Sequence, residues 1–328
     1  MKRFLVRRLL YCVPVLAGIV FVTFVLFRVV GGDPVDQLAG KYATAEQKRE
    51  LRRQLGFDRP LWPDPAPLLR GDWPEFADNQ LFAHFRRTFT LDFGRSRQYH
   101  REIGEMILSG AGPSLSLTVP AFLIGIFLQL TIAVLAAFRR GGLLDRLLVF
   151  ACLIGLSVPY LALIILGQTY LAGKLGWYPV YGYPQTFGPS VAVYVALPVL
   201  LGVAASLGGG VRFYRTVILD EVQADYVRTA RAKGLSPARI MFGHVLKNAM
   251  IPVITQLAVV FPFLFLGSLL LERFFSIPGL GYMLVDAVNA SDWPVINALT
   301  FIESAIYLGA VILTDIGYAL VDPRVSLE

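Results

Sequence analysis

The residues of this chain that could carry chemistry are few and scattered. Its three histidines, His84, His100 and His244, show no His-x-x-x-His or His-Glu-x-x-His spacing and predict no metal site. The glycines at 208–210 are not followed by the Gly-Lys-Ser/Thr of a phosphate-binding loop, and no Gly-x-Ser-x-Gly turn occurs. We therefore expect no catalytic residue, no metal and no cofactor on this chain, and no ATP hydrolysis by the chain itself.

Two acidic residues, Glu303 and Asp315, interrupt the last apolar run. An ionisable side chain at membrane depth costs about 2.5 to 3.5 kcal/mol on insertion scales, so each is by default a functional candidate. Asp315 falls near one end of the run. Glu303 lies either near an interface or on a water-filled path, and is a candidate pathway residue.

The most informative stretch is a polar interval between two apolar runs, residues 220–252. Val222, Tyr226 and Ala230 recur at four-residue spacing and predict one face of a helix over residues 220–233. Basic residues lie on another face and in the last turn: Arg228, Arg231 and Lys233. The interval is either a solvated surface loop or a basic amphipathic helix beside the membrane.

A bend is predicted in the middle of this interval. Gly234 follows the last helical turn and predicts a left-handed cap, and basic residues in that turn suit the negative helix end. Ser236 and Pro237 predict the start of a second helix. A serine side chain at the N-cap accepts from a backbone N–H of the first turn, and proline suits the first helical position because it has no N–H that would be left unpaired there.

The composition places the chain in a bilayer. Of its 328 residues, 55% are hydrophobic and only 16% charged, which is too apolar for an ordinary soluble domain. The net charge of +7 does not indicate nucleic-acid binding, because the basic residues are spread between apolar runs. Cys12 and Cys152 fall inside such runs, where a thiol behaves as a small hydrophobe, so no disulfide is expected.

Six apolar segments predict six membrane spans. The first, residues 9–27, follows four basic residues; it is longer than a signal-peptide core and no Ala-x-Ala site follows, so it predicts a retained anchor. The others are residues 112–138, 147–173, 190–211, 248–271 and 294–320. Prolines inside them predict kinks, because neighbouring helices can satisfy the freed carbonyls.

Residues 31–111 form a predicted extramembrane insert between the first two spans. Thr44 and Gln47 predict a capping box for a charged helix that ends near Gly56. The proline-rich stretch over residues 61–74 predicts a loop.

Charge in the short loops predicts the orientation. Three arginines lie between the second and third spans, and seven Lys/Arg against three acids lie in residues 212–247. The loops on the other side hold only Lys174 and Arg273. The positive-inside rule therefore places both termini and the Gly234 bend in the cytoplasm, with the insert outside.

Several separated motifs resemble the permeases of ABC importers, in the branch that handles dipeptides, oligopeptides and nickel. They are GDP at 32–34, RRQLGFDRPL at 52–61, DFGRS at 92–96, DYVRTARAKGLS at 225–236, HVLKNAMIPV at 244–253, LERFFSIPGLGYMLVDAV at 271–288 and Asp-Pro-Arg at 322–324. Arg228 stands where the general motif of these permeases has glutamate, a feature that is similar in the peptide branch. Residues 62–90 depart from the family pattern.

The resemblance implies an all-α integral membrane protein with the type I ABC-importer permease fold, in which a large extracytoplasmic insert separates the first and second of six helices. It implies an N-terminal helix (1–30), the insert (31–111), a permease core (112–321) with a coupling loop (212–247), and a cytoplasmic tail (322–328). The implied ATPase-coupling residues are Asp225, Tyr226, Arg228, Thr229, Ala230, Arg231, Lys233, Gly234, Leu235, Ser236 and Pro237.

The implied partners are a second homologous permease, two cytoplasmic ABC ATPase subunits that carry ATP and Mg, and an extracytoplasmic binding protein. The implied location is the cytoplasmic membrane of a bacterium or archaeon, and the cargo stays open among dipeptide, oligopeptide, nickel chelate, glutathione and opine. The alternative is an ion-coupled secondary transporter that works alone, with Glu303 and Asp315 as coupling carboxylates. The lack of an internal repeat weighs against it.

Overall fold

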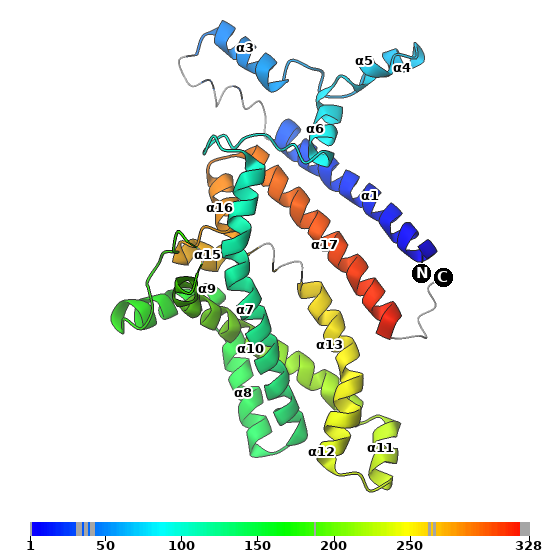
Figure 1. Ribbon diagram of the computed structural model, residues 1–328, viewed down its shortest axis with the longest axis vertical. Coiled ribbons are helices and arrows are strands. Elements are labelled where there is room, and N and C mark those ends of the chain that lie inside the picture. Colours follow the sequence, from blue (N-terminus) through cyan, green and yellow to red (C-terminus); the bar gives the residue numbers. More distant parts are fainter. Residues whose placement is uncertain are drawn as a thin grey trace. The chain divides into compact units, whose positions relative to one another are not determined.

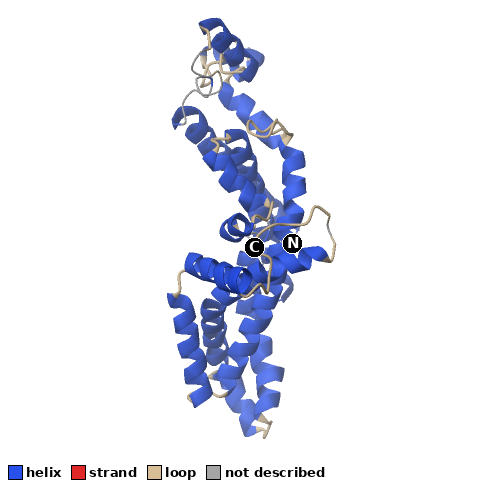
Figure 2. Cartoon of the chain, turned by 90° about the vertical axis from the view of Figure 1, so that its left-hand side faces the viewer, coloured by secondary structure: helices blue, strands red, loops and turns tan. Residues whose placement is uncertain are grey.

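The computed structural model describes residues 2–30, 35, 39, 43–186, 188–261, 264 and 267–321, and every regular element in these ranges is a helix (Figures 1 and 2). The chain divides into two compact units. The N-terminal unit comprises Met1–Ile107 and Ala287–Leu308, and the core unit comprises Leu108–Asp286 and Gly309–Leu327. The GDP motif at 32–34 and the tail at 322–328 lie outside the described residues.

In the N-terminal unit, the first apolar run forms α1 (Lys2–Phe24) and continues as a π-helical turn, η1 (Val25–Val30). α1 packs against α6 (Gln80–Phe89). Phe24 is fully buried at this contact and meets the rings of Trp62 and His84 at centroid distances of 5.6 Å and 5.7 Å. The insert is thus tied to the anchor helix by aromatic packing.

The predicted helix caps of the insert are confirmed. α3 (Ala45–Leu55) begins with a capping box, in which the Thr44 N–H donates to Gln47 Oε1 at 2.9 Å and the Gln47 N–H donates to Thr44 Oγ1 at 3.3 Å. It ends at Gly56, whose φ of 70° is the left-handed cap that glycine favours.

The proline-rich stretch was expected to be a loop, and this is wrong in part. It contains α4 (Ala66–Leu69) and α5 (Trp73–Ala77). Proline is compatible with the first turn of a helix, where no intrahelical N–H bond is lost, and the Asp72 side chain accepts from the Glu75 N–H to cap α5.

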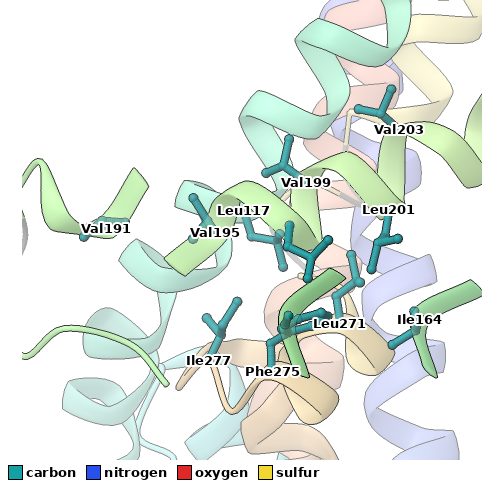
Figure 3. Close-up of a cluster of buried hydrophobic side chains, with 12 residues drawn as sticks. Leu117, Ile164, Val191, Val195, Val199, Leu201, Val203, Leu271, Phe275 and Ile277 are labelled. Carbon is teal, nitrogen blue, oxygen red and sulfur yellow. The ribbon is translucent and has the colours of Figure 1, made fainter. Parts of the chain in front are cut away.

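The core unit is built on two long helices, α7 (Ile103–Phe138), which enters it at Leu108, and α10 (Ser190–Val222). α7 begins before the predicted insert boundary at residue 111. α10 packs against α8 (Leu143–Ser157), α9 (Tyr160–Gly167), α13 (Leu246–Val260) and α15 (Leu269–Phe275). Figure 3 shows one buried cluster, where Leu117 and the α10 valines meet Leu271 and Phe275 of α15.

The third predicted span, residues 147–173, is not one continuous helix. α8 and the segment formed by α9 with the π-helical turn η2 (Gln168–Lys174) meet at an angle of 91°. Pro159 lacks an N–H and disfavours the helical region for the residue before it, and Val158 is accordingly extended, with ψ of 118°. The predicted proline kink is therefore a sharp bend.

The fifth predicted span, residues 248–271, is also interrupted. α13 ends at Val260 and α15 begins at Leu269. Gly267 has a φ of 71°, which lies outside the right-handed helical region and breaks the helix before α15. α16 (Leu280–Asn289) follows a turn at 276–279, and α17 (Trp293–Val321) carries the last apolar run.

Four described helices are long and apolar enough to cross a membrane: Arg7–Val29, Ile103–Phe138, Ser190–Val222 and Trp293–Leu313. The bent pair Leu143–Ser157 and Tyr160–Lys174 would make a fifth span. Large side chains such as Leu147 and Phe150 of α8 are exposed, as expected for a surface that meets lipid or another subunit. The predicted count of six stays a prediction.

Candidate functional site

The polar interval of the core unit folds as two helices around a bend, as predicted. α11 (Asp225–Ala232) ends at Gly234, whose φ is 75°. The Gly234 N–H donates to the Arg231 carbonyl at 2.9 Å, and the Leu235 N–H donates to the Ala230 carbonyl at 3.3 Å. α12 (Pro237–Ile240) starts after Ser236, whose side chain accepts from the Arg239 N–H at 3.4 Å. We call residues 225–240 the coupling segment.

The start of the first helix is corrected. Residues 220–222 are the end of α10, and a turn at Gln223 and Ala224 separates them from α11. Ala224 is extended, with ψ of 151°, so Val222 is not on the helix that carries Tyr226 and Ala230. Propensity alone did not reveal this break, because neither turn residue is a strong helix breaker.

The coupling segment has one buried face. Val227 is 0% exposed and Ala230 is buried, and both pack in a cluster with Tyr214 and Ile218 of α10 and Ala249 of α13. Tyr226 and Leu235 are partly buried against the same cluster. The other predicted coupling residues are exposed: Asp225, Arg228, Thr229, Arg231, Lys233, Gly234, Ser236 and Pro237. The packing anchors the segment and leaves a basic face free to meet a partner.

Tyr226 connects the coupling segment to two long helices. Its hydroxyl donates to Glu221 Oε2 at 2.6 Å, at the end of α10, and is also hydrogen-bonded to Asn248 of α13. Burial, followed by the bond to Glu221, raises the pKa of the Tyr226 phenol. The neutral hydroxyl is therefore a fixed donor between α11 and α10.

The turn between α7 and α8 is held to α10 by a carboxylate. Asp145 accepts from the Gly141 N–H at 2.9 Å and from two nitrogens of Arg215, each at 2.8 Å. Asp145 is buried, and such a bidentate pair fixes geometry as well as charge. Both this turn and the coupling segment lie at the same end of the core unit (Figure 1).

A groove of about 900 Å³ opens between them. Val227, Ile240 and Met241 form part of its apolar wall, and Arg140, Arg228 and Arg231 supply its positive charge. None of the described residues that line it is acidic. A groove of this kind suits a partner surface that has apolar side chains beside acidic ones.

A second cavity, of about 470 Å³, lies among α7, α10 and α13. Of the described residues that line it, none is ionisable at neutral pH, and the polar ones are Thr118, Gln129, Tyr160, Ser206, Tyr214, Gln256 and Ser268. Gln129 Nε2 donates to Ser206 Oγ at 3.0 Å, and Gly210 gives the Gln129 side chain the space that a Cβ would fill. The cavity can hydrogen-bond a neutral polar group. We call it the membrane cavity.

The turn motif at 271–288 is organised by a carboxylate that sequence reasoning missed. Glu272 is 0% exposed and accepts from Ser114 Oγ at 2.8 Å, the Ser268 N–H at 3.1 Å and the Tyr282 N–H at 2.9 Å. A Cβ on Gly267 or Gly279 would overlap this carboxylate. The glycines of the motif therefore make room for a buried acid.

Glu303 is half-buried in α17, and among the described residues no side chain is found to pair with it. It does not line the membrane cavity. The Asp315 side chain lies outside the described part of the chain. Among the described residues no group of three or more His, Cys, Asp or Glu side chains could hold a metal ion.

Long apolar helices, a neutral cavity among them and an exposed basic bend define a helical membrane permease. The chain matches the family described as binding-protein-dependent transport system inner membrane component over residues 129–327, and the N-terminal family of the same systems over residues 1–108. The chain belongs to this family, the permease subunits of ABC importers. It is a multi-pass inner-membrane permease and not an enzyme.

Named relatives match along almost the whole chain. The chain is 33% identical to the glutathione transport system permease protein GsiC of Salmonella paratyphi A over 328 residues, which is all of both chains. It is 32% identical to GsiC of Escherichia coli K12 over the same full length. It is 31% identical to the probable peptide ABC transporter permease protein y4tP of Sinorhizobium fredii over 325 residues, 98% of each chain. Nothing in these comparisons supports an ion-coupled transporter that works alone.

Proposed function

We propose that this chain forms half of the translocation path of an ATP-driven importer for peptides and peptide-like solutes such as glutathione. Its partners would be a second, related permease, two cytoplasmic ATPase subunits and an extracytoplasmic binding protein. The observation that carries this proposal is the bent coupling segment, which is packed against α10 and α13 on one face and exposed and basic on the other.

In this proposal the coupling segment acts as a lever. The exposed residues of α11 dock on an ATPase subunit, and the apolar groove beside them receives part of that subunit. Closing of the ATPases moves the segment, and Val227, Ala230 and Tyr226 pass the movement to α10 and α13. A packed, hydrogen-bonded element transmits such a displacement because it does not deform continuously.

The membrane cavity is the proposed contribution of this chain to the path. Its polar groups can bond the amide groups of a peptide, and its lack of ionisable side chains avoids selection for one charge. The cargo named for the relatives, glutathione and peptides, fits this chemistry. Glu303 remains a proposed pathway residue.

The proposed topology has six spans, both termini in the cytoplasm and residues 31–111 outside. The basic bias of the loops at 139–146 and 212–247 supports it. ATP and Mg would be bound by the ATPase subunits and not by this chain.

Reconstitution tests the proposal. Proteoliposomes that contain this chain, its partner permease, the ATPases and the binding protein should accumulate labelled glutathione or L-alanyl-L-alanine only with ATP. The matched arm contains this chain alone with a proton or sodium gradient. Uptake in that arm, with none in the ATP arm, would instead indicate the ion-coupled alternative.

A further inference from the structure

A third cavity lies in the N-terminal unit, beside η1, α3 and α6. Its volume is about 220 Å³. Among the described residues, five arginines and one acid, Asp92, line it, so these residues carry a formal charge of +4 (five minus one). The arginines are Arg28, Arg53, Arg59, Arg87 and Arg97. We call it the arginine cavity.

Two of these arginines are engaged within the chain. The Arg28 guanidinium lies 3.8 Å from the centre of the Phe57 ring, and Arg59 pairs with Asp78 at 3.1 Å on an exposed surface. Arg53, Arg87 and Arg97 have no ion-pair partner among the described residues. Arg97 is half-buried and is attracted by the charge of Asp292, with which it forms no direct ion pair. Its partly desolvated guanidinium would favour a further carboxylate that enters the cavity.

Histidine does not add to this charge. His84 lines the cavity, but burial first, and then the charge of Arg28, lower its pKa from 6.5 to about 4. The cavity thus keeps a fixed set of guanidinium donors at physiological pH, and guanidinium is the group that binds carboxylates in a planar, bidentate manner.

The cavity also has groups for an N–H donor and for an apolar side chain. Gln80 Oε1 and Asn297 Oδ1 are buried acceptor atoms that have no hydrogen-bond partner among the described residues, and both residues line the cavity. Phe57, Phe93 and Trp293 give it aromatic walls. A buried acceptor that lacks a donor costs about 1 to 3 kcal/mol, so a ligand with an amide N–H would relieve this cost.

We propose that the arginine cavity binds the C-terminal residue of a small peptide, with its carboxylate on Arg53, Arg87 and Arg97 and its amide N–H on Gln80 or Asn297. Inorganic phosphate would satisfy the arginines and could donate a P–OH to one acceptor, but it has no apolar group to place against the aromatic walls. The proposal deepens the proposed function, because the bound group belongs to the class of cargo assigned to the importer.

Calorimetric titration of the full chain in lipid nanodiscs tests the proposal without ATPases or a binding protein. L-Alanyl-L-alanine should bind, and its C-terminal amide, which differs only in the carboxylate, should not. Arg97→Gln should weaken binding about tenfold, the equivalent of ~1.4 kcal/mol. Arg49→Gln, an exposed arginine of α3 that does not line the cavity, should leave binding unchanged.

Equal binding of the acid and the amide, equal binding by Arg97→Gln, or no binding would overturn the proposal. Tighter binding of phosphate than of the dipeptide would also overturn it, in favour of a general anion site. If Arg97→Gln unfolds at a lower temperature than the parent, Arg53→Gln, which changes an exposed lining residue, takes its place. If the dipeptide does not bind to the chain but ATP-dependent uptake is observed, the arginine cavity is rejected as a peptide site and the proposed function is retained.

Discussion

The Tyr226 hydroxyl donates a 2.6 Å hydrogen bond to Glu221 across the turn that separates α11 from α10. These two residues join the exposed basic helix to the longest helix that begins and ends inside the core unit. The bond is short and partly buried, and its acceptor is a carboxylate, so it belongs to the stronger class of hydrogen bonds.

Tyr226→Phe should uncouple transport from ATP hydrolysis without removing the protein from the membrane. The ring keeps its packing, while the bonds to Glu221 and Asn248 are lost, at a cost of about 1.5 to 3 kcal/mol for a bond to a charged group. Uptake per ATP hydrolysed should fall in proteoliposomes. Tyr181→Phe, at an exposed position outside the coupling segment, is the control. An unchanged ratio in Tyr226→Phe would show that the bond does not contribute to coupling.

Glu272→Ala should destabilise the core unit. It leaves the Ser114 hydroxyl and the N–H groups of Ser268 and Tyr282 without their acceptor, and each buried unpaired donor costs about 1 to 3 kcal/mol. The thermal midpoint of the variant in detergent should drop by several degrees. Arg273→Gln breaks a more exposed ion pair with Asp286 and should have a smaller effect. Equal midpoints for the two variants would contradict this account of the turn.

His84 should make the N-terminal unit sensitive to acid. Its pKa is about 4 in the folded chain and 6.5 when exposed, so below pH 6.5 the unfolded chain binds the proton more readily. Stability should therefore be unaffected above pH 6.5 and should fall as the pH is lowered towards 4, by about 3 kcal/mol over the window. The measurement is the thermal midpoint at pH 7 and pH 5. His84→Gln should flatten this dependence, and His244→Gln, at an exposed position, should not. If His84→Gln leaves the pH dependence of the thermal midpoint unchanged, His84 is not the source of the acid sensitivity.

Thiol labelling in intact cells tests the proposed topology. With Cys12 and Cys152 replaced by serine, a cysteine at the exposed position of Glu75 should react with an impermeant reagent. A cysteine at Ser236, also exposed, should react only after the membrane is permeabilised. The reverse pattern of labelling would invert the assigned orientation.

Features that depend on neighbours in sequence could be predicted, and features that depend on distant partners could not. The caps at Thr44, Gly56, Gly234 and Ser236 rest on bonds within a few residues, and all four are present. The Glu272 site requires Ser114, 158 positions away, and no local pattern marks that pair. The sharp bend at Pro159 could be predicted in part. Proline predicts the position of the break, but the angle of the bend depends on packing against distant residues.

The bend at Gly234 carries the central claim, that the coupling segment must keep its angle for transport. With φ at 75°, any side chain is strained by about 1 to 2 kcal/mol, although a Cβ would meet no other atom within 4 Å. The strain is therefore in the backbone alone, and β-branched valine should suffer most. Gly234→Ala should be milder, and Gly234→Asn milder still, because asparagine tolerates the left-handed region.

The decisive measurement is ATP-dependent uptake by Gly234→Val in proteoliposomes with matched amounts of protein in the membrane. Gly243→Ala is the matched control, because this exposed glycine has an ordinary φ and equally open surroundings. We predict that Gly234→Val inserts normally and loses most of its uptake, while Gly243→Ala transports like the parent. Among the three variants at position 234, the loss of uptake should be largest for valine, smaller for alanine and smallest for asparagine. Normal uptake by Gly234→Val at normal membrane levels would contradict the claim that this bend couples the permease to its ATPases.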